Sequence, residues 1–588
     1  MIGYHVPTRR VVSRTDLGPG QFVQALAADN MGRYLYAGIV YNGDTDQPNL
    51  FRWDLADTSQ PAHAIGRAEQ LDVRALAVAP DGKVYAVGMQ TRPGLWEYDP
   101  ATGQVVRIAT PDPGATQARG VAATADTVFY ASGSNLSGGD GASRAGLYAI
   151  DRQTHTVASI LPPELAMDPS ARDVAIFGEY IFVGTEGADQ PAKVAAIRLD
   201  DYRSYRAAVT AGKSAKCYVR IGDDVYFMAE VLQKFSLVTG ELKTLPVGEG
   251  IGEVWGMAQV GNALVIVSAA GHVAEYDLAT GKVTAQDLVA AGAPADAQLG
   301  MAVAAAGGHA YVAGNGAIAH HNLATGAVTN LAAPGEAKDM EIIGGVLHTG
   351  QYNSQGIWRF SPSSGQPPHQ AVRLPVAQNR PQDVHWDAAT GLLLVGVQCD
   401  TLGGGSFVTY RLTTGEVKVH VNPFDEYQMV KCVTAQDGVA YLGGENRYEP
   451  GPRGELAAWD PVAGRELWRF DPQLGDGVTS LVALGWRLYG ITVRGKFFVV
   501  DLRNRTVIHT ANLRALAPDR TTLVLSRGRI YGASSKSLFR VDPRSYEAAA
   551  VVPDLAAEWY SGARLAVDEN NDLYTLRGRN LIRVRDLA

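Results

Sequence analysis

Short apolar segments alternate with glycine-containing turns along the whole chain, and the alternation recurs about every 45 residues. Each repeat has an apolar strand, a second strand ending in Gly, an aromatic-x-Asp-x-x-Thr-Gly segment and a polar strand. The clearest copies are "VYAVGMQTRPGLWEYDPATGQVVRI" (84–108), "HVAEYDLATGKVTAQDL" (272–288), "HHNLATGAVTNL" (320–331) and "LAAWDPVAGRELWRF" (456–470). Because apolar and polar positions alternate with period 2, the pattern predicts four short strands per repeat.

Repeats of this length with four strands each predict a β-propeller, because one four-stranded blade cannot bury both of its faces alone. First strands begin near residues 22, 73, 119, 172, 216, 255, 300, 338, 382, 430, 478, 522 and 563. One ring holds about four to eight blades. We therefore expect an all-β chain of two tandem β-propellers with about 13–14 four-stranded blades, either six plus seven or seven in each ring. Helix should be limited to short loop turns such as residues 162–171.

No linker rich in Pro or Ser separates the two expected rings, and the best candidate boundary is "VAAGAPADAQLG" (289–300). The last unit supplies only three strands, whereas residues 4–18 resemble an orphan fourth strand. Because open sheet edges are a liability, we expect residues around 5–16 to complete the blade that ends at Ala588. The first propeller is then 1–295, completed by 560–588, and the second is 296–559. The alternative is a disordered N-terminal tail.

Composition excludes several classes of protein. The 588 residues carry a net charge of −8, from 52 basic and 60 acidic residues, with no basic run, so nucleic acid is not an expected partner. Three cysteines cannot form a disulfide framework or a zinc site. No apolar stretch is long enough to cross a membrane. As given, the chain is expected to be cytoplasmic, or secreted if a leader peptide has been removed.

The segment "LAAWDPVAGRELWRF" (456–470) resembles the aromatic-Asp-x-x-x-Gly-x-x-x-Trp repeat of the quinoprotein-like and YVTN-type propellers. This resemblance spans nearly the whole chain and implies the propeller fold. Enzymes, scaffolds and assembly factors share that fold, so it implies no activity. The tryptophan-docking pattern and the cofactor residues of quinone-dependent dehydrogenases are not recognisable, and no cofactor is expected.

A basic residue recurs where the first strand of a blade begins, at the mouth of the central channel. The basic residues at this position are Arg74, Arg119, Arg172, Lys216, Lys338 and Lys431, and Gln382 occupies the equivalent place. Cations around one narrow mouth repel each other unless they are paired with acids or bind an anion. Two interpretations stay open: an anion-binding mouth, or ion pairs with Asp173, Asp339 and Asp383, each of which directly follows this position.

Polar residues also gather in the loops between second and third strands, which face the same side. The candidates are Tyr41, Asn42, Gln90, Arg92, Tyr352, Asn353, Gln398, Glu445, Arg447 and Tyr448. Amide, guanidinium and phenol groups suit sugar hydroxyls and carboxylates. Polar loop tips are equally what any propeller in water shows.

Neither the histidines nor any standard catalytic motif identifies a metal or catalytic site. Adjacent residues of a strand face opposite sides, so His320 and His321 do not bind one ion, and no metal site is predicted. His385 is predicted to pack between blades and is kept as a candidate base. The sequence has no Gly-x-Ser-x-Gly elbow, His-Glu-x-x-His, P-loop or EF-hand loop.

Two functions from different classes follow. The first is binding of a small anionic ligand or saccharide, extending to a lyase that cleaves uronate-containing saccharides by β-elimination. Arg74, Arg119 and Arg172 would neutralise the carboxylate, and Tyr41 or Tyr352 would act as the base. The second is a non-catalytic scaffold that binds a protein partner. Arginines that are all bridged by neighbouring acids favour the scaffold, whereas unpaired arginines converging on a polar pocket favour the lyase.

Overall fold

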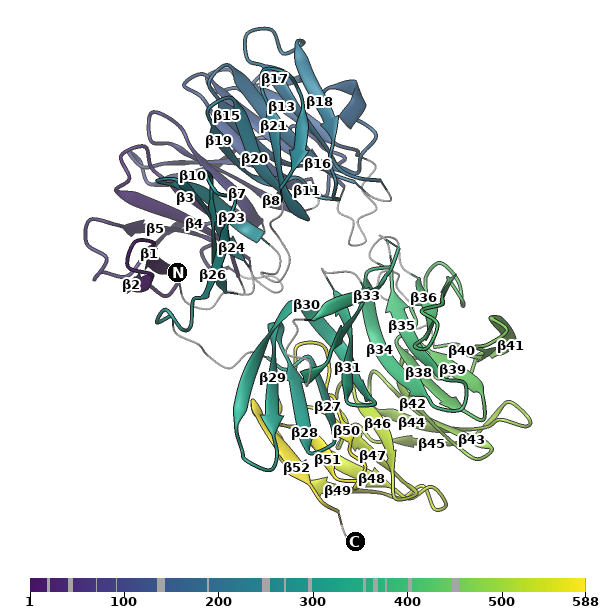
Figure 1. The fold of residues 1–588 in the computed structure, drawn as a ribbon. Coiled ribbons are helices and arrows are strands. Elements are labelled where there is room, and N and C mark those ends of the chain that lie inside the picture. The colour runs from purple at the N-terminus through teal and green to yellow at the C-terminus, as the bar shows by residue number, and fades with distance from the viewer. Residues whose placement is uncertain are drawn as a thin grey trace. The chain divides into compact units, whose positions relative to one another are not determined.

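A computed structural model shows an all-β chain that forms two tandem β-propellers, which confirms the predicted fold class (Figure 1). It describes residues 1–17, 22–40, 46–69, 71–90, 92–134, 143–187, 190–245, 254–268, 271–293, 299–352, 356–362, 368–375, 378–399, 404–446 and 454–586. The chain divides into two compact units, Met1–Ala295 and Asp296–Ala588. Helix in the described residues is confined to short 3-10 turns such as η1 (Pro163–Leu165).

The described residues of the first unit form six antiparallel four-stranded blades, preceded by a two-stranded hairpin. The hairpin is β1 (Ile2–His5) and β2 (Arg10–Arg14). The blades are β3 (Phe22–Ala28), β4 (Tyr34–Val40), β5 (Leu50–Asp54), β6 (His63–Gly66); β7 (Asp72–Val78), β8 (Val84–Met89), β9 (Leu95–Asp99), β10 (Gln104–Ala109); β11 (Gln117–Ala123), β12 (Thr127–Gly133), β13 (Gly146–Asp151), β14 (Val157–Ser159); β15 (Ser170–Phe177), β16 (Tyr180–Glu186), β17 (Lys193–Arg198), β18 (Tyr205–Val209); β19 (Lys216–Ile221), β20 (Asp224–Ala229), β21 (Val231–Ser236), β22 (Leu242–Thr244); and β23 (Val254–Val260), β24 (Ala263–Ser268), β25 (His272–Asp277), β26 (Val283–Asp287).

The second unit forms seven blades in its described residues. They are β27 (Ala302–Ala306), β28 (His309–Ala313), β29 (Asn315–Asn322), β30 (Val328–Ile343); the second half of β30 with β31 (Val346–Tyr352), β32 (Gly356–Phe360), β33 (His369–Arg373); β34 (Arg380–Asp387), β35 (Leu392–Gln398), β36 (Gly405–Arg411), β37 (Val417–Val421); β38 (Cys432–Gln436), β39 (Val439–Gly443), β40 (Leu456–Asp460), β41 (Arg465–Phe470); β42 (Val478–Leu484), β43 (Arg487–Thr492), β44 (Lys496–Asp501), β45 (Thr506–Asn512); β46 (Thr522–Ser526), β47 (Arg529–Ala533), β48 (Leu538–Val541), β49 (Ala548–Val552); and β50 (Ala566–Val567), β51 (Leu573–Arg577), β52 (Asn580–Val584).

The repeated Asp-x-x-Thr-Gly motif is the turn between the third and fourth strands of a blade. In the sixth blade, Asp277 Oδ1 accepts hydrogen bonds from the backbone N–H of Ala279 at 3.0 Å and of Thr280 at 2.7 Å. Gly281 follows with a φ of +70°, and its N–H donates to the Asp277 carbonyl at 2.8 Å. Only glycine adopts this left-handed conformation without strain. The motif therefore encodes turn chemistry and not a ligand site.

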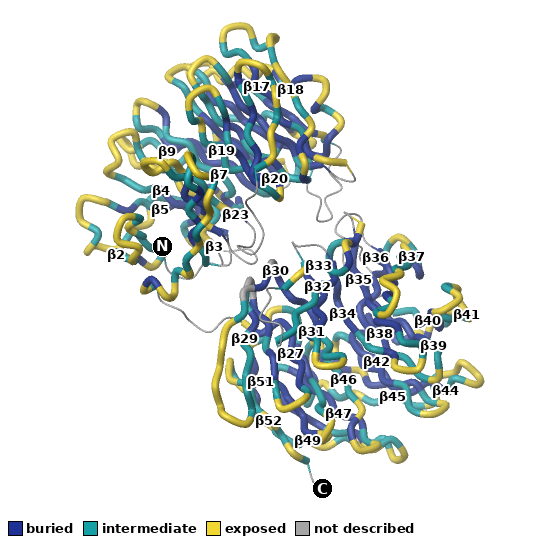
Figure 2. Tube along the Cα trace, viewed as in Figure 1, coloured by how far each residue is buried: buried dark blue, intermediate teal, exposed yellow. Residues whose placement is uncertain are grey.

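The core lies between neighbouring blades, where apolar side chains of successive sheets interlock. Between the fourth and fifth blades, Phe182, Phe227 and Phe235 are fully buried, with ring centroids 5.5–5.9 Å from Phe182. The outermost strands are mostly exposed, as Figure 2 shows in yellow for β18. A blade is thus stabilised by its neighbours, which is why the repeat must close or cap its ends.

The second unit closes on itself through its own last blade. β50 lies beside β27 and β46, and the Tyr560 N–H donates to the Gly300 carbonyl at 2.9 Å. Residues 560–588 therefore belong to the second propeller, and the expectation that they complete the first is wrong. The seventh blade has three strands in the described part of the chain.

The N-terminal segment contacts both the first and the last blade of the propeller to which it belongs. β1 pairs with β2, so the segment is a hairpin and not a single fourth strand. On one side it reaches the sixth blade. The Val11 N–H donates to the Ala291 carbonyl at 3.0 Å, and the Tyr4 hydroxyl donates to Gln286 Oε1 at 2.9 Å.

On its other side the hairpin contacts the first blade. Met1 and Leu17 pack against the buried cluster that contains Ile39 and Phe51. Thr15 Oγ1 accepts the Ala62 N–H at 2.8 Å. The hairpin therefore joins the first blade to the sixth. The segment was predicted to complete the blade that ends at Ala588, but its partners are the first and sixth blades of its own unit.

Candidate ligand sites at the channel mouths

In several blades a β-bulge places the residue at this repeated position, often a cation, at the start of the innermost strand. The extra residue lies between the paired positions Val73 and Ala75, Ala118 and Gly120, Ala171 and Asp173, Val254 and Gly256, Ala337 and Asp339, and Pro381 and Asp383. These bulge residues are Arg74, Arg119, Arg172, Trp255, Lys338 and Gln382. A bulge turns one side chain out of the regular alternation, so the repeat aims this position at the channel mouth.

In the first propeller, Arg119 and Arg172 converge on the carboxylate of Glu186. The Glu186 Oε1 atom lies 3.2 Å from Arg119 Nη1 and 3.2 Å from Arg172 Nε. Gln117, fully buried, donates from Nε2 to Glu186 Oε2 at 3.4 Å. Burial opposes the charge of Glu186, but Arg119 and Arg172 hold its pKa below the usual value. A carboxylate of the protein therefore occupies the centre of the basic cluster.

Arg172 retains hydrogen-bonding capacity beside this carboxylate. Its Nε donates to Ser214 Oγ at 3.1 Å, and neither of its Nη groups donates a hydrogen bond within the described part of the chain. The side chain is 12% exposed. A guanidinium presents its donors in a planar fork that matches a carboxylate. Arg172 can therefore bind a second anion at the rim while it stays paired with Glu186.

The same mouth carries another cation and an exposed aromatic ring. The Lys216 ammonium lies 4.8 Å from the centroid of the Trp255 ring, and Trp255 is 40% exposed. Arg74 hydrogen-bonds Gln24 and lies 3.5 Å from Asp72. An exposed indole beside cations suits the apolar face of a sugar ring whose substituents are charged.

Asp173, Asp339 and Asp383 accept hydrogen bonds from the backbone of the next blade, whereas they were predicted to form ion pairs with the residue before them. Asp173 Oδ2 accepts the N–H of Cys217 in the next blade at 3.0 Å. Asp339 and Asp383 accept the N–H groups of Val384 at 2.8 Å and Val433 at 2.6 Å in the same way. Each carboxylate thus fastens its blade to the next one.

Burial of the Asp173 carboxylate has an electrostatic consequence. Burial raises the pKa of Asp173 to about 6, although its backbone hydrogen bonds and Arg172 oppose the shift. The described part of this mouth thus contains four cations and three carboxylates. The cations are Arg74, Arg119, Arg172 and Lys216, and the carboxylates are Asp72, Asp173 and Glu186.

The mouth of the second propeller is more completely occupied by its own side chains. Lys338 forms an ion pair with Glu336, and its ammonium lies 4.5 Å from the Tyr560 ring centroid. Tyr352 accepts a hydrogen bond from Arg380 Nη2 at 2.8 Å. Lys338 is only 6% exposed. The predicted residues Lys338 and Tyr352 therefore lie together, but the Lys338 side chain is buried and already paired with Glu336.

Lys431 and Gln398 belong to a second chain of polar contacts in that mouth. The Lys431 ammonium donates to Gln382 Oε1 at 2.7 Å, and Gln382 Nε2 donates to Gln398 Oε1 at 3.1 Å. Burial, reinforced by Arg564, lowers the pKa of Lys431 to about 7.

Arg564 crosses from the seventh blade to the second and third. It donates to the carbonyls of Lys338 at 3.0 Å and Gln382 at 2.7 Å. Its Nη1 lies 3.7 Å from Asp339 and 3.9 Å from Asp383. The guanidinium therefore spans the channel mouth and ties non-adjacent blades together.

Two of the candidate bases belong to a different propeller from the candidate arginines, and the third, Tyr41, lies outside the described residues. Tyr352 and His385 are in the second unit, whereas Arg119 and Arg172 are in the first. His385 is half-buried in β34, and burial lowers its pKa. Tyr352 and His385 are therefore not part of the mouth that carries Arg119 and Arg172.

The remaining predicted site residues lie in loops. Gln90 follows β8 and is half-buried, and Arg92, with a φ of 57°, donates its backbone N–H to the Ala115 carbonyl at 3.1 Å. Glu445 pairs with Arg520 at 2.9 Å. Tyr41, Asn42, Asn353, Arg447 and Tyr448 lie outside the described residues.

Three residues of the mouths were missed by sequence reasoning. Trp255 and Arg564 occupy the repeated position in "VWGMA" and "ARLAV", so the alignment carried a signal for both. Glu186 ends a second strand, and no local pattern marks it as the partner of two arginines.

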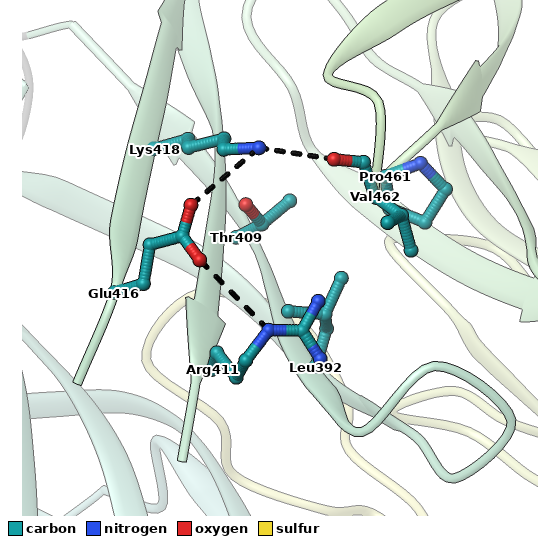
Figure 3. Close-up of a pocket in the computed structure, with 7 residues that line it drawn as sticks. All are labelled: Leu392, Thr409, Arg411, Glu416, Lys418, Pro461 and Val462. Atoms are coloured by element: carbon teal, nitrogen blue, oxygen red, sulfur yellow. Dashed lines mark hydrogen bonds and ion pairs between the residues drawn. The ribbon is translucent and has the colours of Figure 1, made fainter. Parts of the chain in front are cut away.

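A small surface hollow lies between the third and fourth blades of the second unit (Figure 3). Its empty volume is about 180 Å³, and it is lined by Leu392, Thr409, Arg411, Glu416, Lys418, Pro461 and Val462. Glu416 lies 3.6 Å from Lys418 and 3.9 Å from Arg411. The charged side chains of this hollow pair with one another, so it does not suit the main ligand site.

The described residues contain no group of three or more His, Cys, Asp or Glu side chains placed to hold a metal ion. Within that part of the chain, no helix is long and apolar enough to cross a membrane.

No family model and no curated protein matches the chain. Among solved structures it is similar to the computationally designed Ika8 protein, with 14% identity and a TM-score of 0.32 over 54% of this chain and 92% of that one. It is also similar to the tricorn protease, with 12% identity and a TM-score of 0.34 over 96% of this chain and 62% of that one. Similarities this low assign no function.

Proposed function

We propose that the first propeller binds a carboxylate-bearing ligand, such as a uronate-containing saccharide, at the mouth lined by Arg119, Arg172, Lys216 and Trp255. The observation that supports this most directly is the Arg172 fork, whose Nη groups donate no hydrogen bond within the described residues. The ligand carboxylate would engage this fork, and a sugar ring would stack on Trp255.

Glu186 sets the strength and selectivity of this site. Its carboxylate neutralises part of the charge of Arg119 and Arg172, so a single carboxylate ligand competes with it. Binding is therefore expected to be of modest affinity and to weaken as ionic strength rises.

The test is calorimetric titration of the protein with oligogalacturonate, using a neutral glucose oligomer of equal length as the control ligand. Arg172→Ala should weaken binding of the acidic oligomer about tenfold or more, since a charge-assisted hydrogen bond contributes about 1.5–3 kcal/mol. Trp255→Ala should weaken it as well. Arg198, a half-buried arginine paired with Glu179 at 2.7 Å, offers a matched control, and Arg198→Ala should leave binding unchanged.

Equal binding of the neutral and acidic oligomers, or full binding by Arg172→Ala, overturns the proposal and favours the scaffold alternative. β-Elimination is tested in the same samples by the ultraviolet absorbance of the unsaturated product. Such turnover would extend the proposal from binding to a lyase.

A further inference from the structure

A pair of histidines faces one another across two strands of the first blade of the second propeller. His309 begins β28, and His320 lies near the end of β29. His320 Nε2 lies 2.9 Å from His309 Nδ1. The partner of His320 is thus a residue on the neighbouring strand, eleven positions earlier in the chain, and not the adjacent His321.

The ring of His320 is held in place from two sides. It stacks on the buried Tyr311 ring, with centroids 4.7 Å apart and planes 9° from parallel. Its other nitrogen, Nδ1, lies 3.3 Å from Thr329 Oγ1 on β30. Metal-binding histidines typically donate the second ring N–H to an oxygen in this way, which directs the free nitrogen toward the ion.

From this geometry we infer that His309 and His320 form a two-histidine site for a borderline transition-metal ion, with Zn²⁺, Ni²⁺ and Cu²⁺ as the matching class. In the tautomers that leave both facing nitrogens unprotonated, the two imidazoles present their lone pairs to a common point. Metal–nitrogen distances of about 2.0–2.1 Å in a tetrahedral site require the nitrogens to be about 3.3 Å apart. The pair therefore needs to open by only about 0.4 Å to admit an ion.

The surroundings agree with a partly open site. Both imidazoles are half-buried, so solvent water can complete the coordination sphere. Imidazole favours Zn²⁺, Cu²⁺ and Ni²⁺ over Mg²⁺ or Ca²⁺, which prefer oxygen ligands. With two protein ligands, the affinity should be well below that of a closed four-ligand site.

The experiment is calorimetric titration of the metal-stripped full chain with ZnCl₂, repeated with CuCl₂ and followed by electron paramagnetic resonance. Wild-type protein should show a site whose Cu²⁺ spectrum reports two coordinated imidazole nitrogens. His309→Ala and His320→Ala should each weaken binding at this site at least tenfold. His321→Ala is the matched control, since His321 pairs with Ala310 on β28 and points to the opposite face.

His309→Gln keeps a hydrogen-bonding side chain opposite His320, so it remains decisive if His320→Ala lowers stability. Loss of the two-nitrogen spectrum in His309→Gln, with its melting temperature unchanged, supports the site. Absence of Zn²⁺ binding by the wild type up to millimolar metal overturns the inference, as does unchanged binding by both alanine variants.

Discussion

Replacing Glu186 by Gln tests whether the basic cluster of the first propeller is organised around this carboxylate. Gln has the same shape and keeps an oxygen for hydrogen bonding, but it removes the charge that Arg119 and Arg172 share at 3.2 Å each. Glu186 and Arg172 are each 12% exposed and Arg119 is 18% exposed, so solvent screens these contacts only partly.

The expected loss follows from those two contacts. A hydrogen bond to a charged group contributes about 1.5–3 kcal/mol and a neutral one about 1 kcal/mol. Exchanging two charged contacts for neutral ones should cost the first propeller about 1–4 kcal/mol at pH 7, whereas breaking a fully buried pair costs roughly 3–5 kcal/mol.

The pH dependence of this loss has a definite sign. The pKa of Glu186 is lower in the folded protein than its unfolded value of 4.5. Its stabilising contribution is therefore complete above about pH 4.5 and disappears as pH falls through the folded pKa. The stability difference between wild type and Glu186→Gln should be largest near neutral pH and vanish in acid.

The same substitution should strengthen anion binding. At an effective dielectric constant of about 20, two like charges about 5 Å apart repel by roughly 3 kcal/mol. Removing the Glu186 charge should therefore raise affinity for the acidic oligomer about tenfold or more, while stability falls.

Urea unfolding, followed by hydrogen exchange of peptides from β11 to β16, measures the stability of this region. Glu179 is a control in the same blade, since it pairs with Arg198 at the surface with 73% of its side chain exposed. Glu179→Gln should change stability by less than about 0.5 kcal/mol. If Glu186→Gln is as stable as wild type at pH 7, or binds the acidic oligomer no better, the reasoning is refuted.

Deleting residues 1–16 should lower the melting temperature of the first propeller alone, because the hairpin joins its first and sixth blades. Calorimetry that shows the unfolding transition of the first propeller unchanged would contradict this. The raised pKa of Asp173 means that the folded state binds its proton more tightly, so stability of this propeller should increase as pH falls from about 6 toward 4, and Asp173→Asn should remove that part of the pH profile. Arg564→Met should destabilise the second propeller by about 3–5 kcal/mol at pH 8, since it leaves Asp339 and Asp383 uncompensated. Urea unfolding with exchange at β50 measures this, and a loss below about 1 kcal/mol would show that the guanidinium does not brace the channel.

The sequence by itself determined the strands and turns of this protein. Period-2 alternation and the Asp-x-x-Thr-Gly turn depend only on near neighbours, as the hydrogen bonds from Asp277 to Ala279 and Thr280 show. For that reason the blades, their starting positions and the all-β class could be read directly. The recurring cation was also visible, because it occupies one position of the repeat, which in several blades is a β-bulge.

Only the tertiary structure decided what those positions contact. Glu186 meets Arg119 from 67 positions away, and Arg564 reaches Lys338 across 226 positions. Ring closure brings such residues together, and no local pattern encodes which blades become neighbours of a side chain that crosses a channel. The hairpin at the N-terminus shows the same limit. Its sequence indicated a role in joining blades, but the blades that it joins are decided by its packing on the cluster around Ile39 and its hydrogen bond to Ala291.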